Sequence, residues 1–439
     1  MRITKLQLKN IGVFEDVTIS FPEKTNKDKA EIHIFTGENG TGKSTILYAL
    51  SCIKQSSEDY RGIYMNPENE SEYLKYLRTE KSLQDLPIIK RFRYNGDKSN
   101  ISISFDESSS IDIYRSEISI SVQSSLRNYL HSIIFYPNNS VEFAFFAYSG
   151  NRNFKNTSLE AIRDIIENPF EKSLDFEKAT DFSLFIQWLA NTKAKEALEL
   201  AKNNTIKAEQ YKRTIIGIEN TISEITGKEI KFILETEPLN VFIQSDGQTL
   251  DFDVLPDGLK SIISWIGDLL MRMDRIRWKT DEDVFDRNFI LFLDEIELHL
   301  HPAWQRRILP VIQKLFKNAQ IFISTHSPFV VGSVEDAWVY KLKLEDGQIK
   351  NVPSPEESKA GDSISLILNE IFDIEEEFDV ETEKGFAEFY QLKKQLLSGE
   401  SKDFKKIEKK GEDLAKISLE VRDIIGREIR QLKKLIPSD

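Results

Sequence analysis

Cysteine is almost absent from this chain, since Cys52 stands alone among 439 residues. One cysteine excludes an intrachain disulfide, so nothing in the composition points to an oxidising compartment. Long apolar runs are also missing, because no stretch approaches the roughly 20 apolar residues that span a bilayer. The first 21 residues alternate polar and apolar side chains, as strands do, and lack the apolar block of a signal peptide. We therefore expect a soluble, cytoplasmic protein with no membrane among its partners.

Positive charge is in deficit, because 59 Lys and Arg face 72 Asp and Glu and the formal net charge is −13. This balance excludes a globally basic nucleic-acid binder and leaves only local patches. Two segments interleave cations with aromatics, residues 90–94 (KRFRY) and 272–279 (RMDRIRWK). Each pattern is typical either of a nucleic-acid contact or of a solvated strand or helix face. DNA or RNA therefore stays open as a ligand.

Residues 37–45, GENGTGKST, have the spacing G-x-x-x-x-G-K-[ST] of a phosphate-binding loop. An alternating apolar stretch precedes them and an apolar-periodic stretch follows, which predicts the strand–loop–helix context of that motif. Glycines let several backbone N–H groups point at one anion, and the helix N-terminus adds positive charge. We expect Lys43 to reach the β- and γ-phosphates and the Ser44 hydroxyl to ligate Mg²⁺. The alternative is a glycine-rich turn before an ordinary helix.

Two later segments predict buried parallel strands with functional carboxyl ends. Residues 288–302, NFILFLDEIELHLHP, hold an apolar run that ends in two acids. Asp294 is expected to hold the Mg²⁺ shell, and Glu295 to polarise the attacking water as general base. A second apolar run, residues 321–323, ends in Ser-Thr-His, which places His326 to donate to the γ-phosphate. The alternatives are acids without a function and a structural histidine.

Residues 255–270, LPDGLKSIISWIGDLL, predict a glycine-containing turn that opens an apolar-periodic helix. Such a helix N-terminus binds phosphate when a second subunit offers it. Pro-Asp-Gly is also an ordinary turn before a helix. The position of the turn ahead of the acidic strand favours the functional interpretation.

In this order, the segments GENGTGKST, LPDGLKS, ILFLDE and STHS resemble the ABC-type ATPases. The opening ITKLQLKNIGVFEDVTISF is similar to the branch that contains RecF, Rad50, SMC and the OLD proteins. LDEIELHLHPAWQRRILPVIQKLF and FISTHSPFVV resemble the PtuA-like and OLD-like ATPases of bacterial antiphage systems. The resemblance covers about residues 1–54 and 233–344.

This resemblance implies an ATP site with Mg²⁺, in which Glu295, His326 and Lys43 serve catalysis and Ser44 and Asp294 hold the metal. It implies a signature turn at 255–261 that closes on the ATP of a partner subunit through Gly258 and Lys260. Pro256 stands where the family turn often has serine, so one hydroxyl contact is missing. The residues implied to bind the triphosphate are Gly37, Glu38, Asn39, Gly40, Thr41, Gly42, Lys43, Ser44 and Thr45. Relatives often carry a nucleotide-proximal arginine near Tyr148 and Arg152.

The predicted fold class is α/β: an ABC-type P-loop ATPase head, with a mixed sheet flanked by helices, a helical insertion and a C-terminal helical region. The head spans residues 1–355, interrupted by a β-rich insertion at about 56–132 and a helical insertion at about 155–230. Asn95-Gly96 predicts a hairpin in the first. Residues 356–439 form a charged helical region for partner or subunit docking. Its apolar stripe, which either docks or packs on its own core, is Phe386, Phe389, Leu392, Leu396 and Leu397.

No nuclease domain like that of the OLD nucleases follows residue 330, and the acids 375–377 have no metal-ligand spacing. We therefore expect an ATPase with no nuclease activity of its own, assembled as a dimer or a multiple of dimers. Its function would be that of a sensor that holds or activates a separate effector protein, such as a nuclease, in antiphage defence. The alternative is a RecF/Rad50-like repair ATPase that binds DNA directly. A transporter subunit and an adenylate-kinase-like phosphotransferase fit the motifs less well.

Overall fold

A computed structural model describes residues 1–53, 91, 99–106, 109–115, 120–124, 140–150, 159, 161–176, 180–358, 361–374, 376–400 and 403–435. The chain forms two compact units, Met1–Ile367 and Leu368–Asp439. The boundary falls later than the predicted residue 355, because residues 356–367 attach to the first unit. Ser358 Oγ donates to Val334 O at 2.8 Å, and Ile367 packs against Gly332.

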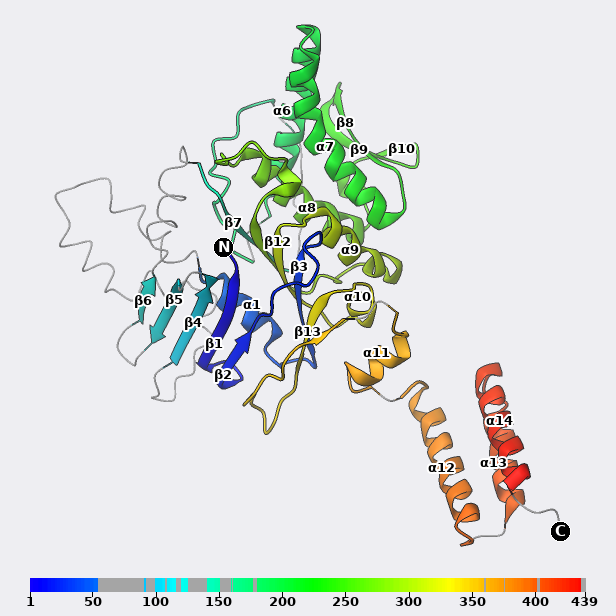
Figure 1. The fold of residues 1–439 in the computed structure, drawn as a ribbon. Helices are drawn as coiled ribbons and strands as arrows, with labels where there is room; N and C mark the ends of the chain where they lie inside the picture. Colours follow the sequence, from blue (N-terminus) through cyan, green and yellow to red (C-terminus); the bar gives the residue numbers. More distant parts are fainter. Residues whose placement is uncertain are drawn as a thin grey trace. The chain divides into compact units, whose positions relative to one another are not determined.

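A six-stranded sheet forms the centre of the first unit (Figure 1). Its order is β14–β13–β3–β12–β11–β7, and every neighbouring pair is parallel except β13–β14. The strands are β3 (Glu31–Gly37), β7 (Ala144–Tyr148), β11 (Phe289–Leu293), β12 (Ala319–Ser324), β13 (Ala337–Leu342) and β14 (Glu356–Glu357). All residues of β7, β11 and β12 are buried, as parallel strands covered on both faces require. The mixed sheet confirms the predicted α/β class.

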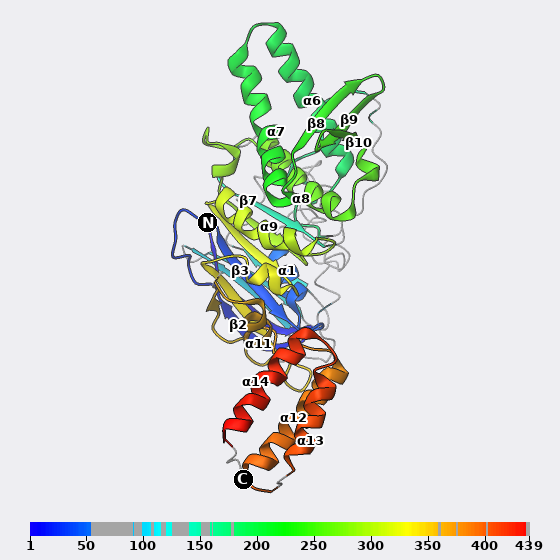
Figure 2. The ribbon, with the colours of Figure 1, turned by 90° about the vertical axis from the view of Figure 1, so that its right-hand side faces the viewer.

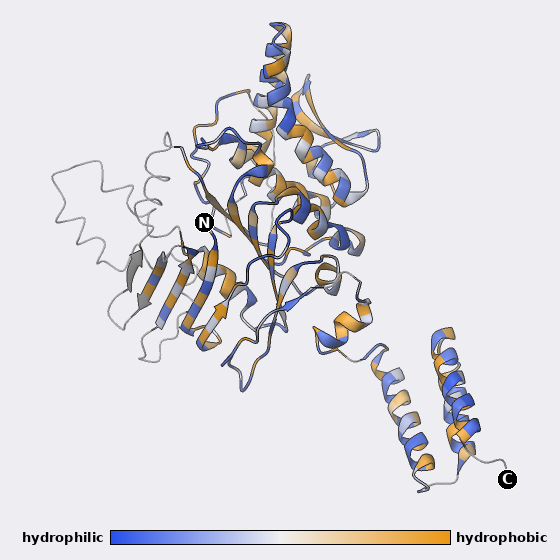
Figure 3. Ribbon diagram, viewed as in Figure 1, coloured by the Kyte–Doolittle hydropathy of each residue, from blue (hydrophilic) through white to orange (hydrophobic). Residues whose placement is uncertain are grey.

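A five-stranded antiparallel sheet, β2–β1–β4–β5–β6, shares one core with helix α1 (Lys43–Ser51) and the six-stranded sheet. Figure 3 shows β1, β2 and β4 alternating between hydrophobic and hydrophilic residues, whereas the strands of the central sheet are largely hydrophobic. The strands are β1 (Ile3–Ile11), β2 (Phe14–Ser20), β4 (Ser99–Phe105), β5 (Ser110–Arg115) and β6 (Ile120–Ser124). Because β4 pairs with β1, the described part of the predicted β-rich insertion extends the N-terminal sheet. The predicted hairpin at 95–96 lies outside the described residues.

Helices α6 (Phe182–Ala201) and α7 (Thr205–Thr226) form an antiparallel hairpin, side by side in Figure 2. Asp181 caps α6 and Asn204 caps α7, each through a side-chain oxygen that accepts a backbone N–H. A three-stranded sheet follows, made of β8 (Ile230–Thr236), β9 (Leu239–Ser245) and β10 (Gln248–Leu250). Helix α8 (Asp257–Arg275) packs against both α6 and α7.

The remaining helices of the first unit cover the sheet or connect its strands. They are η4 (Phe252–Val254), η5 (Val284–Asp286), α9 (Pro302–Leu315), α10 (Pro328–Val331) and α11 (Ile364–Glu370), the last of which crosses into the second unit. Helices α8 and α9 lie on the opposite side of the central sheet from α1 (Figure 1). Among the helices in the described ranges, none combines the length and the apolar character needed to cross a bilayer.

Residues 161–176, part of the predicted helical insertion, contain neither helix nor strand. Two arginines of α8 account for this difference. Arg272 Nη1 donates to Pro169 O and Glu171 O, both at 2.7 Å, and Arg275 Nη2 donates to the carbonyls of Ile165 and Glu167. Carbonyl oxygens that would accept helix N–H groups are thus bound by side chains from another element.

The second unit is a bundle of α12 (Val380–Leu397), α13 (Phe404–Leu414) and α14 (Leu419–Leu435). Its core includes Phe386 and Phe389 of the predicted stripe, with Leu392 and Leu396 partly buried against them. These four residues therefore pack on their own core, the second of the two alternatives for the stripe, whereas Leu397 is 52% exposed. An amphipathic pattern predicts that a helix face is covered, not what covers it.

A buried polar network fastens β1 to the amino-terminal ends of β3 and β12. Glu31 accepts from Arg2 Nε at 2.8 Å and from Gln320 Nε2 at 2.6 Å, and His33 Nε2 lies 2.8 Å from the same carboxylate. Gln320 also bonds the backbone N–H and carbonyl of Ile3, each at 2.8 Å. Burial raises the pKa of Glu31, but hydrogen bonds and charge from His33 and Arg2 outweigh it and lower the pKa to about 2.

Replacing Glu31 with alanine is expected to destabilise the first unit by about 3 kcal/mol, because the Arg2 guanidinium and the Gln320 amide lose their buried acceptor. Urea denaturation at pH 7 measures this change. Since the folded pKa lies below that of the unfolded chain, the stabilisation is present above pH 4.5 and is lost as the pH falls towards 2. The exposed Glu23→Ala is the matched control. Equal unfolding free energies for both variants at pH 7 would contradict the assignment.

Candidate functional site

The carboxyl ends of β3, β11 and β12 meet at one edge of the central sheet. Parallel pairing sets Leu293 beside Ile323 and Ser324 beside Phe35, so the residues that follow these strands are neighbours. The phosphate-binding loop, Asp294 and Glu295, and His326 follow β3, β11 and β12 respectively. Ligands of open α/β sheets bind at such an edge. The structure thus brings together three motifs that lie up to 289 residues apart in the chain, from Gly37 to His326.

Two glycines of the loop have backbone conformations and neighbours that exclude a side chain. Gly37 has φ 144°, and a Cβ there would lie 2.3 Å from Leu342 O. Gly42 has φ 84°, and a Cβ there would lie 2.6 Å from the Phe14 ring. The loop is also fastened internally, because Thr41 Oγ1 donates to Glu38 O at 2.8 Å. The spacing of the motif therefore has a packing reason as well as a phosphate-binding one.

Lys43 turns back onto its own loop. Its ammonium donates to Gly37 O at 2.9 Å and to Glu38 O at 2.8 Å. Burial lowers the pKa of Lys43 to about 8, while the charges of Glu297, Asp294 and Glu295 act in the opposite direction. We predict that an incoming phosphate would bind this cation, which lies among loop carbonyls and near three acids.

Two hydroxyls converge on the Asp294 carboxylate. Ser44 Oγ donates to Asp294 Oδ1 at 2.9 Å, and Ser324 Oγ donates to the same oxygen. Ser324 also accepts the backbone N–H of Glu295 at 2.9 Å, so it links both acids that follow β11 to the end of β12. The adjacent hydroxyl of Ser44 and carboxylate of Asp294 fit Mg²⁺, which binds hard oxygen ligands and completes its shell with water and phosphate. Ser324 was not predicted as a site residue, because no sequence motif fixes its spacing from Asp294.

Glu295 has an uncommon backbone conformation, with φ 48°. A non-glycine residue in this region is held there by its surroundings, and such residues cluster at active sites. Gly150 lies directly behind it, since a Cβ on Gly150 would be 2.9 Å from Glu295 Cβ. The fixed backbone sets the direction of a half-buried side chain that we predict to act as general base.

His326 lies beside the same acids and is half-buried. Burial lowers the pKa of its imidazole, the charge of Lys43 lowers it further, and that of Asp294 raises it. Its backbone N–H donates to Glu297 Oε1 at 2.6 Å. Burial raises the pKa of Glu297 above its ordinary value. Hydrogen bonds from the His326 backbone and Thr325 lower it but do not outweigh burial. Glu297 was not predicted, although a third acid so close to Asp294 and Glu295 was a visible signal.

The predicted signature turn is present at the start of α8, where Pro256 occupies the N-cap position. Gly258 is buried, and a Cβ there would lie 2.6 Å from His299 O. Lys260 Nζ donates to Asp253 O at 2.8 Å. The turn belongs to a helix that packs on α6 and α7, whereas α1 packs on β3, β11 and β12. Phosphate contacts by Gly258 and Lys260 stay predictions that need a second subunit.

Other residues singled out in the sequence have structural partners. Tyr148 is 1% exposed and donates to Asp268 Oδ2 at 2.8 Å, so its hydroxyl has a buried protein partner. Arg272 of the 272–279 patch is buried and donates through Nε to the same Asp268 oxygen at 2.6 Å. Lys279 pairs with Glu142 at 2.7 Å. The patch is therefore not a solvated helix face over its whole length, and two of its cations, Arg272 and Lys279, are paired with acids.

Parts of two further predictions lie outside the described residues. Of the 90–94 patch, only Arg91 is described, and its guanidinium covers the Tyr48 ring and donates to Thr45 Oγ1 at 2.6 Å. Arg152 falls within the undescribed range 151–158.

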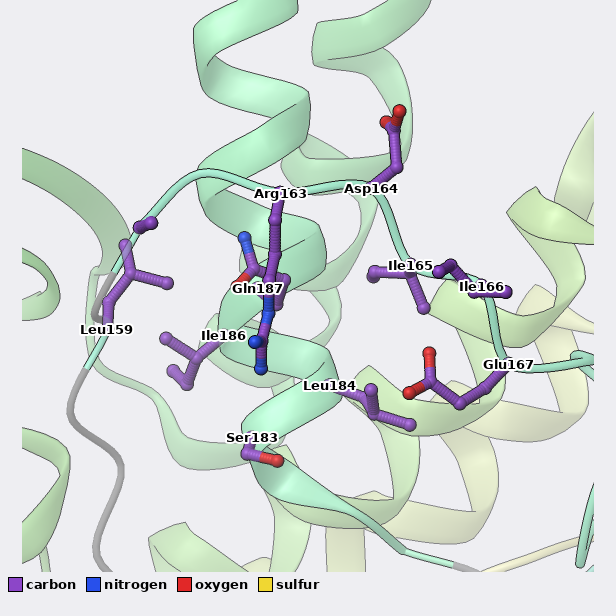
Figure 4. A pocket seen from close by; sticks show the side chains of 11 residues that line it. Leu159, Arg163, Asp164, Ile165, Ile166, Glu167, Ser183, Leu184, Ile186 and Gln187 are labelled. Atoms are coloured by element: carbon purple, nitrogen blue, oxygen red, sulfur yellow. The ribbon is translucent and has the colours of Figure 1, made fainter.

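A cavity of about 390 Å³ lies between residues 159–167 and the first turns of α6 (Figure 4). Its lining mixes apolar side chains such as Ile186 with charged ones such as Arg163 and Glu167. None of the predicted ATP-binding residues lines it, so the cavity is a separate feature of the first unit.

Comparisons with known proteins identify the family to which the chain is similar. The family model "AAA domain, putative AbiEii toxin, Type IV TA system" matches residues 32–332, and a second model, "AAA domain", matches residues 1–55. The chain is 25% identical over 435 residues to "Retron Ec83 probable ATPase" of Escherichia coli, covering 85% of this chain and 76% of that protein. It is 23% identical to "Septu protein PtuA" of Bacillus thuringiensis, covering 85% of each.

Among solved structures, an SmcHead bound to the C-winged helix domain of ScpA aligns with a TM-score of 0.46 and 16% identity. That alignment covers 81% of this chain and 97% of the other.

Proposed function

Because this chain belongs to the AAA-domain family whose model matches residues 32–332, we propose that it is the Mg²⁺-dependent ATPase of a bacterial antiphage defence system, active in the cytoplasm. The ATPase activity itself follows from the family and from the relatives named as ATPases. In our proposal the chain works as a dimer, or a multiple of dimers, that holds or activates a separate effector protein. Mg²⁺ would bind at Ser44 and Asp294 and neutralise charge on the β- and γ-phosphates.

The observation that carries the chemistry is the meeting of Lys43, Asp294, Glu295 and His326 at one sheet edge. Lys43 would bind phosphate, Glu295 would accept a proton from the attacking water, and His326 would donate to the γ-phosphate. The defence role rests on relatives with Retron and Septu names that match over most of the chain. Those names agree with the resemblance to PtuA-like proteins in the sequence itself.

The proposed dimer is supported by the position of the signature turn, which opens α8 while the phosphate-binding loop opens α1. A second subunit that offers this turn would complete the ATP site, and the two identical subunits would share a two-fold interface. ATP bound between them would favour the closed state, and hydrolysis would remove that bias.

Phage plating and ATPase assays with and without duplex DNA test the proposal together. Cells that carry the chain with its neighbouring genes are expected to reduce plaque counts, and Lys43→Ala is expected to abolish that protection. ATP hydrolysis by the purified chain should not depend on DNA. Hydrolysis or assembly that requires DNA would instead favour a RecF/Rad50-like repair ATPase. Protection that survives Lys43→Ala would contradict an ATP-dependent defence role.

A further inference from the structure

Glu297 is a mostly buried acid to which the proposed chemistry gives no part. Its two carboxylate oxygens bind two different donors of the segment that follows β12. Thr325 Oγ1 donates to Oε2 at 2.8 Å, and the His326 backbone N–H donates to Oε1 at 2.6 Å. One side chain therefore holds the hydroxyl of Thr325 and the backbone of His326 at the same time.

The same segment is fastened by two other elements. The Thr325 backbone N–H donates to Phe35 O of β3 at 3.1 Å, and Ser327 Oγ donates to Gln305 Oε1 of α9 at 2.6 Å. Both contacts flank His326, and the Ser327 N–H donates to Thr325 Oγ1 at 3.0 Å, while the His326 N–H itself is accepted by Glu297. Glu297 belongs to the segment that leads from Glu295 to α9, so its bonds join the two segments that carry the predicted base and the predicted histidine.

We propose that Glu297 is a positioning residue for His326, which fixes the histidine against the γ-phosphate through its backbone and through Thr325. This inference rests on the proposed role of His326 in ATP hydrolysis. The carboxylate does not bind substrate or metal in this proposal; it holds the His326 segment, and its charge also stabilises the Lys43 ammonium. A displaced Glu297 would move the histidine and leave the phosphate-binding loop intact.

Glu297→Gln is the first test, because an amide has one oxygen and cannot accept both bonds. We expect kcat for ATP to fall about tenfold while the dissociation constant for ATP changes less than about twofold. Thr325→Val should lower kcat less, since the His326 N–H keeps its acceptor, and Thr325→Ser should restore it. The exposed Glu335→Gln is the matched control and should equal the parent.

A double-mutant cycle with His326→Ala separates positioning from general structure. If Glu297 acts through His326, Glu297→Gln has no further effect on kcat once His326 is alanine. Hydrogen exchange of the peptide around residues 321–331 should also become faster in Glu297→Gln, whether or not ATP is present.

If the two substitutions together lowered kcat by the product of their separate effects, or if hydrogen exchange stayed unchanged, the proposed role of Glu297 would be overturned. Neither result would bear on the proposed ATP hydrolysis. A parent chain that hydrolyses no ATP would overturn the proposed chemistry as well, and the two failures are therefore distinguishable.

Discussion

Lys43→Ala is expected to weaken ATP binding by about 100-fold or more, because one charge-assisted contact to phosphate is lost and acids remain behind it. In the structure, the charges of Glu297, Asp294 and Glu295 stabilise the Lys43 ammonium. Without it, an incoming triphosphate would meet three carboxylates and the carbonyls of Gly37 and Glu38. Titration of a fluorescent ATP analogue, with calorimetry for the parent, measures the change.

The exposed Lys5→Ala on β1 is the control for loss of one positive charge. It should bind ATP as the parent does. Because the two loop carbonyls lose a donor in Lys43→Ala, thermal melting must show that the variant is folded. Parent-like affinity in a folded Lys43→Ala chain would rule out residues 37–45 as the triphosphate site.

Glu295→Gln is expected to lower kcat by about 10² to 10⁴-fold, the usual contribution of a general base, while ATP still binds. Glutamine keeps the size of the side chain, and the backbone of residue 295 stays fixed by Ser324 and Gly150. Single-turnover hydrolysis and nucleotide retention on the purified variant measure the two quantities separately. Hydrolysis at the parent rate would show that another group activates the water.

The part of the site that could be predicted came from motifs that are continuous in the sequence. The glycine spacing of residues 37–45 and the apolar runs of β11 and β12 each specify a local structure, and parallel strands then bring their carboxyl ends together. Ser324 and Glu297 could not be assigned this way, because their bonds to Asp294 and His326 cross about 30 residues without any fixed spacing.

Two features of the fold that the local sequence left unresolved depend on tertiary contacts. Residues 161–176 have a helix-compatible sequence, but Arg272 and Arg275 bind their carbonyls in another conformation. Phe386 and Phe389 form a stripe that suggested docking, and the helices α13 and α14 cover it within the same unit. In both cases contacts with an element distant in the sequence determine the structure that the local pattern adopts.

We predict that two subunits complete each ATP site, with Gly258 and Lys260 of one facing the phosphate-binding loop of the other. The most direct measurement is the native mass of Glu295→Gln with and without ATP. We predict an ATP-dependent shift to an even-numbered assembly, and loss of that shift when Lys260→Glu is added. A Glu295→Gln chain that binds ATP and stays a monomer would contradict the claim.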